Sequence, residues 1–416
     1  MYILSGRRRS EFLACPELVR MSEGSETPEL LLKTTMLSAR YLLRSPILRV
    51  AVMRVHGHLL YGLLFNDGNA EDAVRWSLVE EPDELDRVRE LSSHGSVRVA
   101  VFNEAAVCVV TGDCTVSNVP TLLLSLCEGV TPYPFRRGGV DPETTDEANL
   151  RLDRLLKGTL PPSNGVFVDV LPPTTWTPIL NHFATNSARS GLVSLLDADE
   201  GGQQEALAHW LLDELSPEGV IRGAQVDERG NVRELTDILL THRYGNVLLE
   251  SKALSLLSRP TLPPREKLAK QIVSHVCKAA RQLSGAALNI TEGLSIMDQE
   301  GNIVKVDRAQ PPHLIILIPD LSLLAGREEV GLWFFQSVME KTSGFLHILD
   351  PSELLRGVQA GSMIAARGQT TTSMMAFEYW LIKRAEHLVE IGHPHFHMLL
   401  RFDDEQTDDE PPRPLR

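Results

Sequence analysis

The chain of 416 residues lacks the features that would place it in a membrane or export it. None of its apolar runs approaches the roughly 20 residues needed to cross a bilayer. The N-terminus has no apolar leader, and Arg7, Arg8 and Arg9 stand where one would lie, which argues against a secretory signal. We therefore expect a cytoplasmic protein with no membrane partner, in which residues 1–24 form a disordered or spurious extension.

Cysteine and lysine residues are also few, and glycine motifs of the kind that bind nucleotides are absent. The five cysteines include no CxxC pair, and an odd number in a long chain predicts reduced, buried thiols. No GxGxxG and no GxSxG sequence occurs. The formal net charge of -14 argues against a general binder of polyanions. A local basic surface remains compatible with that charge, because exposed charges act over only about 10 Å in salt solution.

The length of the chain and its composition predict two domains with tails. Clusters of proline and glycine mark a break after the first 130 residues, and the last residues are acidic and rich in proline. The organisation that we expect is an extension at 1–24, an N-terminal α+β domain at 25–130, a linker at 131–165, an α/β domain at 166–402 and an acidic disordered tail at 403–416.

Residues 200 to 360 carry the clearest pattern of alternating elements. Their order is a helix, three strands, a helix, a strand, a helix and a strand. Such an order predicts an α/β fold, with a mixed sheet covered by helices.

One predicted hairpin in this region, "RELTDILLTHRYGNVLLESKA" at 233 to 253, places charged residues among apolar ones. Glu250 and Lys252 share a strand face because they are two residues apart. A two-residue turn at Tyr244–Gly245 would set Asp237 directly opposite Lys252, with Glu250 one diagonal step away. A three-residue turn would move Asp237 to the other face.

Two carboxylates at that separation repel each other unless a cation lies between them. A divalent ion such as Mg²⁺ or Mn²⁺ suits, because Mg²⁺ takes one or two protein carboxylates and keeps several waters. Such a site can hydrolyse phosphodiesters, with Asp237 and Glu250 as metal ligands and Lys252 orienting the water. Among the nine lysines, only Lys252 follows an acid by two residues. The competing interpretation is a cross-strand Asp–Lys pair in a partly exposed hairpin.

These residues resemble the PD-(D/E)xK nuclease superfamily, which has the restriction-endonuclease-like fold. The pattern of that superfamily is a helix with Glu, a strand with Asp, and a strand with Glu-x-Lys. Glu205 matches the helix position, Asp237 matches the strand Asp with Thr236 in place of the usual Pro, and Glu250 and Lys252 match the third element. The resemblance covers about residues 200 to 355 and implies that Glu205 is a third metal ligand.

The following helix of the superfamily often bears Gln. Gln282 matches this position, and Gln271 is the alternative. The closer look-alikes are stand-alone bacterial nuclease-related proteins. The resemblance implies Mg²⁺-dependent cleavage of DNA, less often RNA, as in proteins that act in defence or repair. We expect the N-terminal domain to recognise a target or a protein partner, or to join two copies of the chain. An excess of five positive charges between residues 233 and 283 is compatible with a phosphate-contacting surface.

Two other functions stay open at this point. The chain could be a catalytically inactive binding or scaffold protein that retains the nuclease fold. It could also be a zinc enzyme, since His393, His395 and His397 lie close together in sequence and zinc accepts imidazole ligands.

Overall fold

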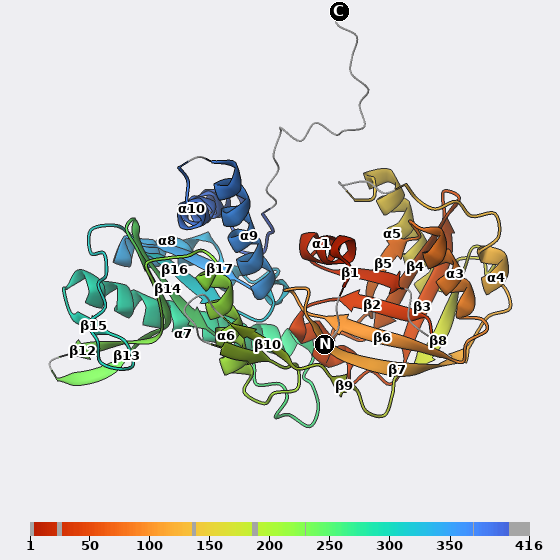
Figure 1. Cartoon of the computed structure of the whole chain (residues 1–416), viewed down its shortest axis with the longest axis horizontal. Coiled ribbons are helices and arrows are strands. Elements are labelled where there is room, and N and C mark those ends of the chain that lie inside the picture. Colours follow the sequence, from red (N-terminus) through yellow and green to blue (C-terminus); the bar gives the residue numbers. More distant parts are fainter. Residues whose placement is uncertain are drawn as a thin grey trace, which may run out of the picture.

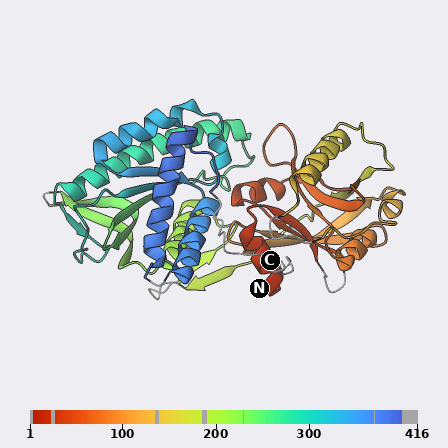
Figure 2. The same ribbon diagram turned by 90° about the horizontal axis from the view of Figure 1, so that it is seen from above.

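The computed structural model describes residues 4–22, 27–134, 139–184, 190–228, 230–368 and 370–398. Two units lie side by side along the long axis of the molecule (Figures 1 and 2), each built around its own mixed sheet. We call them the N-terminal unit, from α1 to β11, and the C-terminal unit, from α6 to α10. The expected α/β class, with a mixed sheet flanked by helices, is therefore confirmed, and the N-terminal unit has a mixed sheet of its own. The predicted acidic tail at 403–416 lies outside the described residues.

The N-terminal unit is a curled sheet in the order β1-β2-β6-β7-β8-β3-β4-β5, with β9 paired to β7. Its edge strands approach each other, since Ser77 Oγ on β5 donates to the Val19 carbonyl on β1 at 2.6 Å. The strands are β1 (Leu18–Ser22), β2 (Glu29–Lys33), β3 (Leu48–Val55), β4 (His58–Phe65), β5 (Ala73–Leu78), β6 (Ser96–Phe102), β7 (Cys108–Asn118), β8 (Gly165–Leu171), β9 (Thr177–Pro178) and the separate hairpin β10 (Asn181–Ala184) and β11 (Ser190–Val193). The helices are α1 (Gly6–Ala14), α2 (Met36–Leu42), α3 (Pro82–Glu90), α4 (Leu123–Leu126) and α5 (Pro142–Leu156).

The first residues belong to this unit, so the expectation of a disordered or spurious extension at 1–24 is wrong for 4–22. Phe12 on α1 is fully buried against Phe102. The ammonium of Lys33 is buried below the helix and donates to the carbonyl of Cys15 at 2.7 Å. Carbonyls at a helix C-terminus lack partners within the helix and favour a cation there. Helix α1 and Lys33 therefore satisfy each other.

The predicted linker at 131–165 is also corrected, and with it the start of the second domain at 166. Helix α5 occupies the middle of that range and packs Ala148, Leu152 and Leu155 on the core formed with β3 and β4. Strand β8 then lies between β7 and β3 in the first sheet. The proline and glycine clusters thus bracket a packed helix instead of separating two domains.

The C-terminal unit follows the order of elements predicted from the sequence, with one short strand added before the fourth predicted strand and two helices added after the last one. Its sheet has the order β15-β12-β13-β14-β16-β17, antiparallel from β15 to β14 and parallel from β14 to β17. The elements are α6 (Glu200–Asp213), β12 (Gly219–Glu228), β13 (Asn231–His242), β14 (Gly245–Ser251), α7 (Arg265–Thr291), β15 (Ser295–Met297), β16 (His313–Leu317), the 3₁₀ turns η1 (Leu321–Leu324) and η2 (Glu328–Val330), α8 (Leu332–Thr342), β17 (Phe345–Leu349), α9 (Pro351–Arg367) and α10 (Ser373–Ile391).

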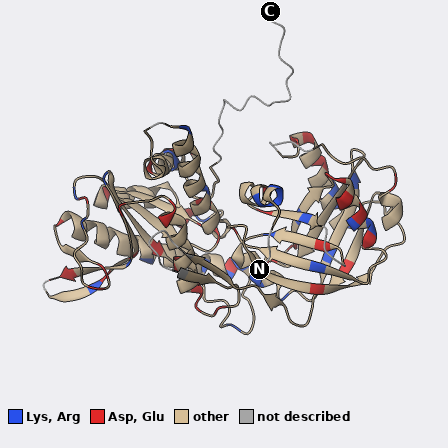
Figure 3. Ribbon diagram, in the orientation of Figure 1, with Lys and Arg blue, Asp and Glu red and all other residues tan. Residues whose placement is uncertain are grey.

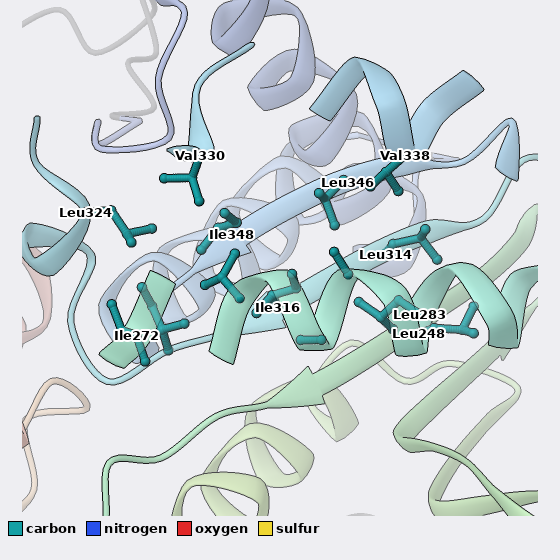
Figure 4. Close-up of a cluster of buried hydrophobic side chains, with 14 of the residues drawn as sticks. Leu248, Ile272, Leu283, Leu314, Ile316, Leu324, Val330, Val338, Leu346 and Ile348 are labelled. Carbon is teal, nitrogen blue, oxygen red and sulfur yellow. The ribbon is translucent and has the colours of Figure 1, made fainter. Parts of the chain in front are cut away.

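Helices cover both faces of this sheet. On one face, α7 and α8 pack over the strands; Figure 4 shows Ile272 and Leu283 of α7 clustered with Leu248, Leu314 and Ile316 of the strands. On the other face, α6, α9 and α10 pack on a second cluster. The strands are therefore apolar on both faces, which is typical of a sheet covered by helices. Within the described ranges, none of the helices is both long and apolar enough to cross a membrane.

Helix α2 joins the two units. Leu37 and Tyr41 lie in the core of the C-terminal unit, whereas Ala39 and Leu42 lie in the core of the N-terminal unit. Arg265, the first residue of α7, donates to Ser38 Oγ at 2.9 Å. The junction is thus packed and hydrogen-bonded, as in a domain interior. All five cysteines are free, as expected; three of them are buried, whereas Cys15 and Cys277 are only partly buried, which the prediction of buried thiols missed.

Candidate active site

The hairpin forms as predicted, but its turn lies one residue earlier. Arg243 and Tyr244 make the turn, so that His242 pairs with Gly245. In this register the residue opposite Asp237 is Glu250, and the predicted opposition of Asp237 to Lys252 is wrong. The error is a shift of two residues along one strand, and a shift of two preserves the face. Asp237 and Glu250 therefore still lie on one face.

The two strands separate at the level of Asp237. We call this opening between β13 and β14, which is lined by Asp237 and Glu250, the fork. The regular ladder of β13 with β14 extends no further than the pair of Ile238 with Leu249. Beyond it, side chains replace backbone partners: Thr236 Oγ1 donates to the Leu249 carbonyl at 2.8 Å, and the Ser251 amide donates to Asp237 Oδ2 at 2.7 Å. Thr236, which stands where the superfamily pattern has Pro, thus links the two strands at the point where the ladder ends.

Asp237 and Glu250 both resist ionisation at this fork. Burial and the charge of Asp237 raise the pKa of Glu250 to about 7, although Lys252 Nζ donates to Glu250 Oε2 at 2.8 Å. Glu250 is only 3% exposed. Burial likewise raises the pKa of Asp237, against the opposing effects of the Ser251 amide and Lys252. One lysine therefore does not offset two carboxylates in this position.

Helix α6 brings Glu205 to the same place. Asp199 caps the helix by accepting from the Gly202 amide, a common N-cap arrangement. One turn further, Gln204 Nε2 donates to Ser251 Oγ and to the Leu317 carbonyl, both at 3.0 Å, which fixes the helix over the end of β14. Burial and the charge of Asp237 raise the pKa of Glu205.

Two further charged residues of the site were not predicted. Arg222 on β12 lies 3.2 Å from Glu205. Glu234 should face away from Asp237 by strict alternation, since the two residues are three positions apart. A β-bulge with Leu235 as the extra residue changes that alternation. Partial burial of its carboxyl group and the charge of Asp237 raise the pKa of Glu234.

Gln282 is the predicted residue that the structure does not join to the others. It is exposed on α7, and no hydrogen bond links it to the other four candidates among the described residues. Gln271, the alternative, accepts from Arg259 at 3.0 Å. His275 lies closer to the site: burial and the charge of Lys252 lower its pKa, and it is hydrogen-bonded to the backbone of Ala253.

The residues present at the fork fit a divalent cation by their chemistry. Burial raises the pKa of four carboxyl groups here, on Glu205, Glu234, Asp237 and Glu250, and the charge of Asp237 raises the pKa of the other three further. Over the part of the chain that the structure describes, no group of three or more His, Cys, Asp or Glu side chains is placed to hold a metal ion. Two carboxylates with water ligands are the arrangement that Mg²⁺ commonly accepts.

The terminal histidines form no comparable site. His397 Nδ1 bonds Glu353 Oε1 at 2.8 Å, and burial together with His397 lowers the pKa of His395. These two residues line a cavity of about 680 Å³ between the units that also includes Asp320 and Asp350. The zinc alternative has no three-residue ligand group among the described residues.

Basic residues between 233 and 283 are partly used in internal contacts. Arg265 is buried against Asp320, and Arg233 pairs with Glu228. Exposed positive charge remains on α7 at Lys267, Lys278 and Arg281. Figure 3 shows charges of both signs interspersed over both units. The phosphate-contacting surface stays a prediction.

No family model matches the chain, and no curated protein matches it. Among solved structures, the chain is similar to the small subunit of the heterodimeric restriction endonuclease R.BspD6I. The sequence identity is 14%, the TM-score is 0.25, and the match covers 45% of this chain and 86% of that chain. A likeness at this TM-score is weak and carries no argument about fold or activity.

Proposed function

We propose that the C-terminal unit is a metal-dependent nuclease that hydrolyses phosphodiester bonds of DNA. The observation that carries the proposal is the fork between β13 and β14, where Asp237 and Glu250 oppose each other and Lys252 follows. The negative charge there exceeds what the neighbouring cations offset. The superfamily resemblance of Glu205, Asp237, Glu250 and Lys252 supports the same activity.

Asp237 and Glu250 would hold a Mg²⁺ or Mn²⁺ ion, and Glu205 on α6 would add negative charge nearby. The ion would supply polarisation of the phosphoryl group. The Ser251 amide holds the Asp237 carboxylate in one orientation through its 2.7 Å hydrogen bond. Lys252, only partly buried, offers an ammonium that can orient the attacking water and offset charge that develops on the phosphate.

Cleavage of supercoiled plasmid in the presence of Mg²⁺ tests the proposal. The wild-type chain is expected to nick or linearise the plasmid, and EDTA is expected to stop it. Asp237→Asn keeps an oxygen that can accept from Ser251 and removes the charge, so it is expected to fold and to be inactive. Failure of the wild type to cleave DNA or RNA with either Mg²⁺ or Mn²⁺ would reject a nuclease.

A binding or scaffold protein is the second candidate, and one contact favours it. The Lys252–Glu250 ion pair already occupies one carboxylate of the fork. If that pair is permanent, Glu250 has no free charge for a cation. Such a protein would bind nucleic acid equally well with and without divalent ions.

A further inference from the structure

Arg40 of the N-terminal unit reaches the first residue of α6 in the C-terminal unit. Its Nη1 lies 2.7 Å from Glu200 Oε2, and the two residues are only 8% and 4% exposed. The other carboxylate oxygen, Glu200 Oε1, accepts from the Leu257 amide at 2.6 Å. A single carboxylate thus receives one hydrogen bond from each unit.

Glu200 stands between two segments that carry candidate site residues. It begins α6, whose next turn places Gln204 on Ser251 and Glu205 at the fork. Its second partner, Leu257, lies in the loop that follows Lys252. Position and orientation of both segments therefore depend on where this one carboxylate lies.

A small cavity with several polar groups in its lining continues the same contact. Its volume is about 40 Å³, and its lining includes Arg40, Asn103 and Glu104 from one unit and Gln204 and Ala253 from the other. Arg40 Nε, Asn103 Nδ2 and Glu104 Oε2 are buried atoms without a hydrogen-bond partner among the described residues. Buried polar groups are rarely left without partners, and about 10–15 Å³ suffices for one water. The cavity therefore suits ordered water that would bridge the two units.

We propose that Arg40 is a positioning residue for the candidate active site, acting through Glu200 on α6 and on the loop 253–258. The effect on catalysis rests on the proposed nuclease function, whereas the ordering of the loop does not. Without the guanidinium of Arg40, Glu200 is a buried carboxylate with no cation beside it, and it must turn toward water. The Leu257 amide then loses its acceptor, and Lys252 and Gln204 lose their fixed positions.

Hydrogen–deuterium exchange on the full chain tests the ordering. In Arg40→Gln, amides of residues 252–258 are expected to exchange about tenfold faster than in the wild type, the effect of losing one hydrogen bond of about 1.4 kcal/mol. Amides of β16 and β17 are expected to stay unchanged. Unchanged exchange in 252–258 of folded Arg40→Gln overturns the proposal, as does an equal increase over the whole unit.

A matched control breaks a different contact between the units. Arg265 Nε donates a hydrogen bond to the backbone carbonyl of Asp67, in the N-terminal unit, at 2.9 Å. The same Nε lies 3.4 Å from the Asp67 carboxylate. Asp67→Asn removes this ion pair without touching Glu200. It is expected to leave exchange in 252–258 at the wild-type rate, and an increase equal to that of Arg40→Gln would overturn the proposal.

Arg40→Lys covers the case in which Arg40→Gln does not fold. It keeps the positive charge but lacks the planar guanidinium. It is expected to raise exchange in 252–258 by about twofold to threefold, less than the loss of one hydrogen bond. Exchange at the wild-type rate in Arg40→Lys, with Arg40→Gln unfolded, overturns the proposal.

Cleavage kinetics test the catalytic consequence. In Arg40→Gln, kcat is expected to fall about tenfold or more while KM for DNA stays within about twofold, because misplaced catalytic groups lower kcat and distant binding surface is unaffected. A rise of KM with kcat unchanged contradicts positioning. Inactivity of the wild type rejects the nuclease and leaves the exchange result standing, so the two failures are distinguishable.

Discussion

Two buried glutamates of the C-terminal unit differ in how their charge is offset. Glu353, near the start of α9, is fully buried and is held by Arg384 at 2.9 Å, by His397 at 2.8 Å and by Arg356. Although burial opposes its ionisation, these partners lower its pKa. Glu250, nearly as buried, has Lys252 as its cation and Asp237 as its neighbour, and its pKa rises to about 7.

The difference separates a structural carboxylate from a candidate catalytic one. Glu353 has its cations built into the fold, so nothing further is needed to stabilise its charge. At the fork, Glu205, Glu234, Asp237 and Glu250 face Lys252 and Arg222, which leaves negative charge in excess. Groups with strongly perturbed pKa values that the fold does not neutralise are typical of functional sites.

The largest expected effect is on activity at the fork. Asp237→Asn and Lys252→Met should each lower plasmid cleavage by about 10³-fold or more, since each removes a group that stabilises the reacting phosphate. The circular dichroism spectrum should stay unchanged. Retention of more than a tenth of wild-type activity in either variant would exclude that residue from the chemistry.

Removing the structural carboxylate should instead damage the fold. Glu353→Gln leaves Arg384 buried without its carboxylate, and breaking a buried ion pair costs about 3–5 kcal/mol. Chemical denaturation should show this loss in the free energy of unfolding. A loss below about 1 kcal/mol would mean that the network around Glu353 contributes as little as a surface ion pair.

The equivalent change at the fork should stabilise the protein. In EDTA at about pH 8, Glu250→Gln should raise the free energy of unfolding by about 1–2 kcal/mol, because the wild type must keep an unfavourable buried charge. In the folded state, Glu250 keeps its proton up to about pH 7, whereas the ordinary pKa of a glutamate is 4.5. The wild type therefore loses stability as the pH rises through this interval.

The same experiment at about pH 5 provides the internal control, because Glu250 is then protonated in the folded wild type. The advantage of Glu250→Gln should shrink to about a quarter there, because that pH lies only just above the ordinary pKa of 4.5. An equal advantage at both pH values would trace the effect to packing and would remove the contrast with Glu353.

The smallest expected effect is stabilisation by the metal. At about ten times its dissociation constant, Mg²⁺ should raise the free energy of unfolding of the wild type by about 1.4 kcal/mol. Asp237→Asn should show no such gain, and Glu353 should retain its network in both proteins. Equal stabilisation of wild type and Asp237→Asn would place the ion elsewhere.

The sequence predicted the parts of this site that depend on local periodicity. Spacing of two residues put Glu250 and Lys252 on one face, and a two-residue turn put Asp237 with them. The exact register was wrong, because Gly245 begins β14 with a φ of 149° instead of completing the turn. Local sequence allowed either position of the turn.

Features that depend on tertiary structure were not predictable in this way. Glu234 reaches the fork through a bulge, and alternation alone places it on the other face. His275 and Gln282 differ by two turns of a 27-residue helix, and only the packing of α7 decides which one lies by Lys252. Strand β8 returns to the first sheet across α5, so clusters of proline and glycine misplaced the boundary.

The central claim is that Asp237 and Glu250 together hold one divalent cation, and direct titration with Mn²⁺ tests it best. Binding measured by calorimetry or electron paramagnetic resonance at about pH 8 should show one site in the wild type and none in Asp237→Asn or Glu250→Gln, as ligand removal requires. Absence of binding in the wild type, or equal binding in all three proteins, would contradict the account.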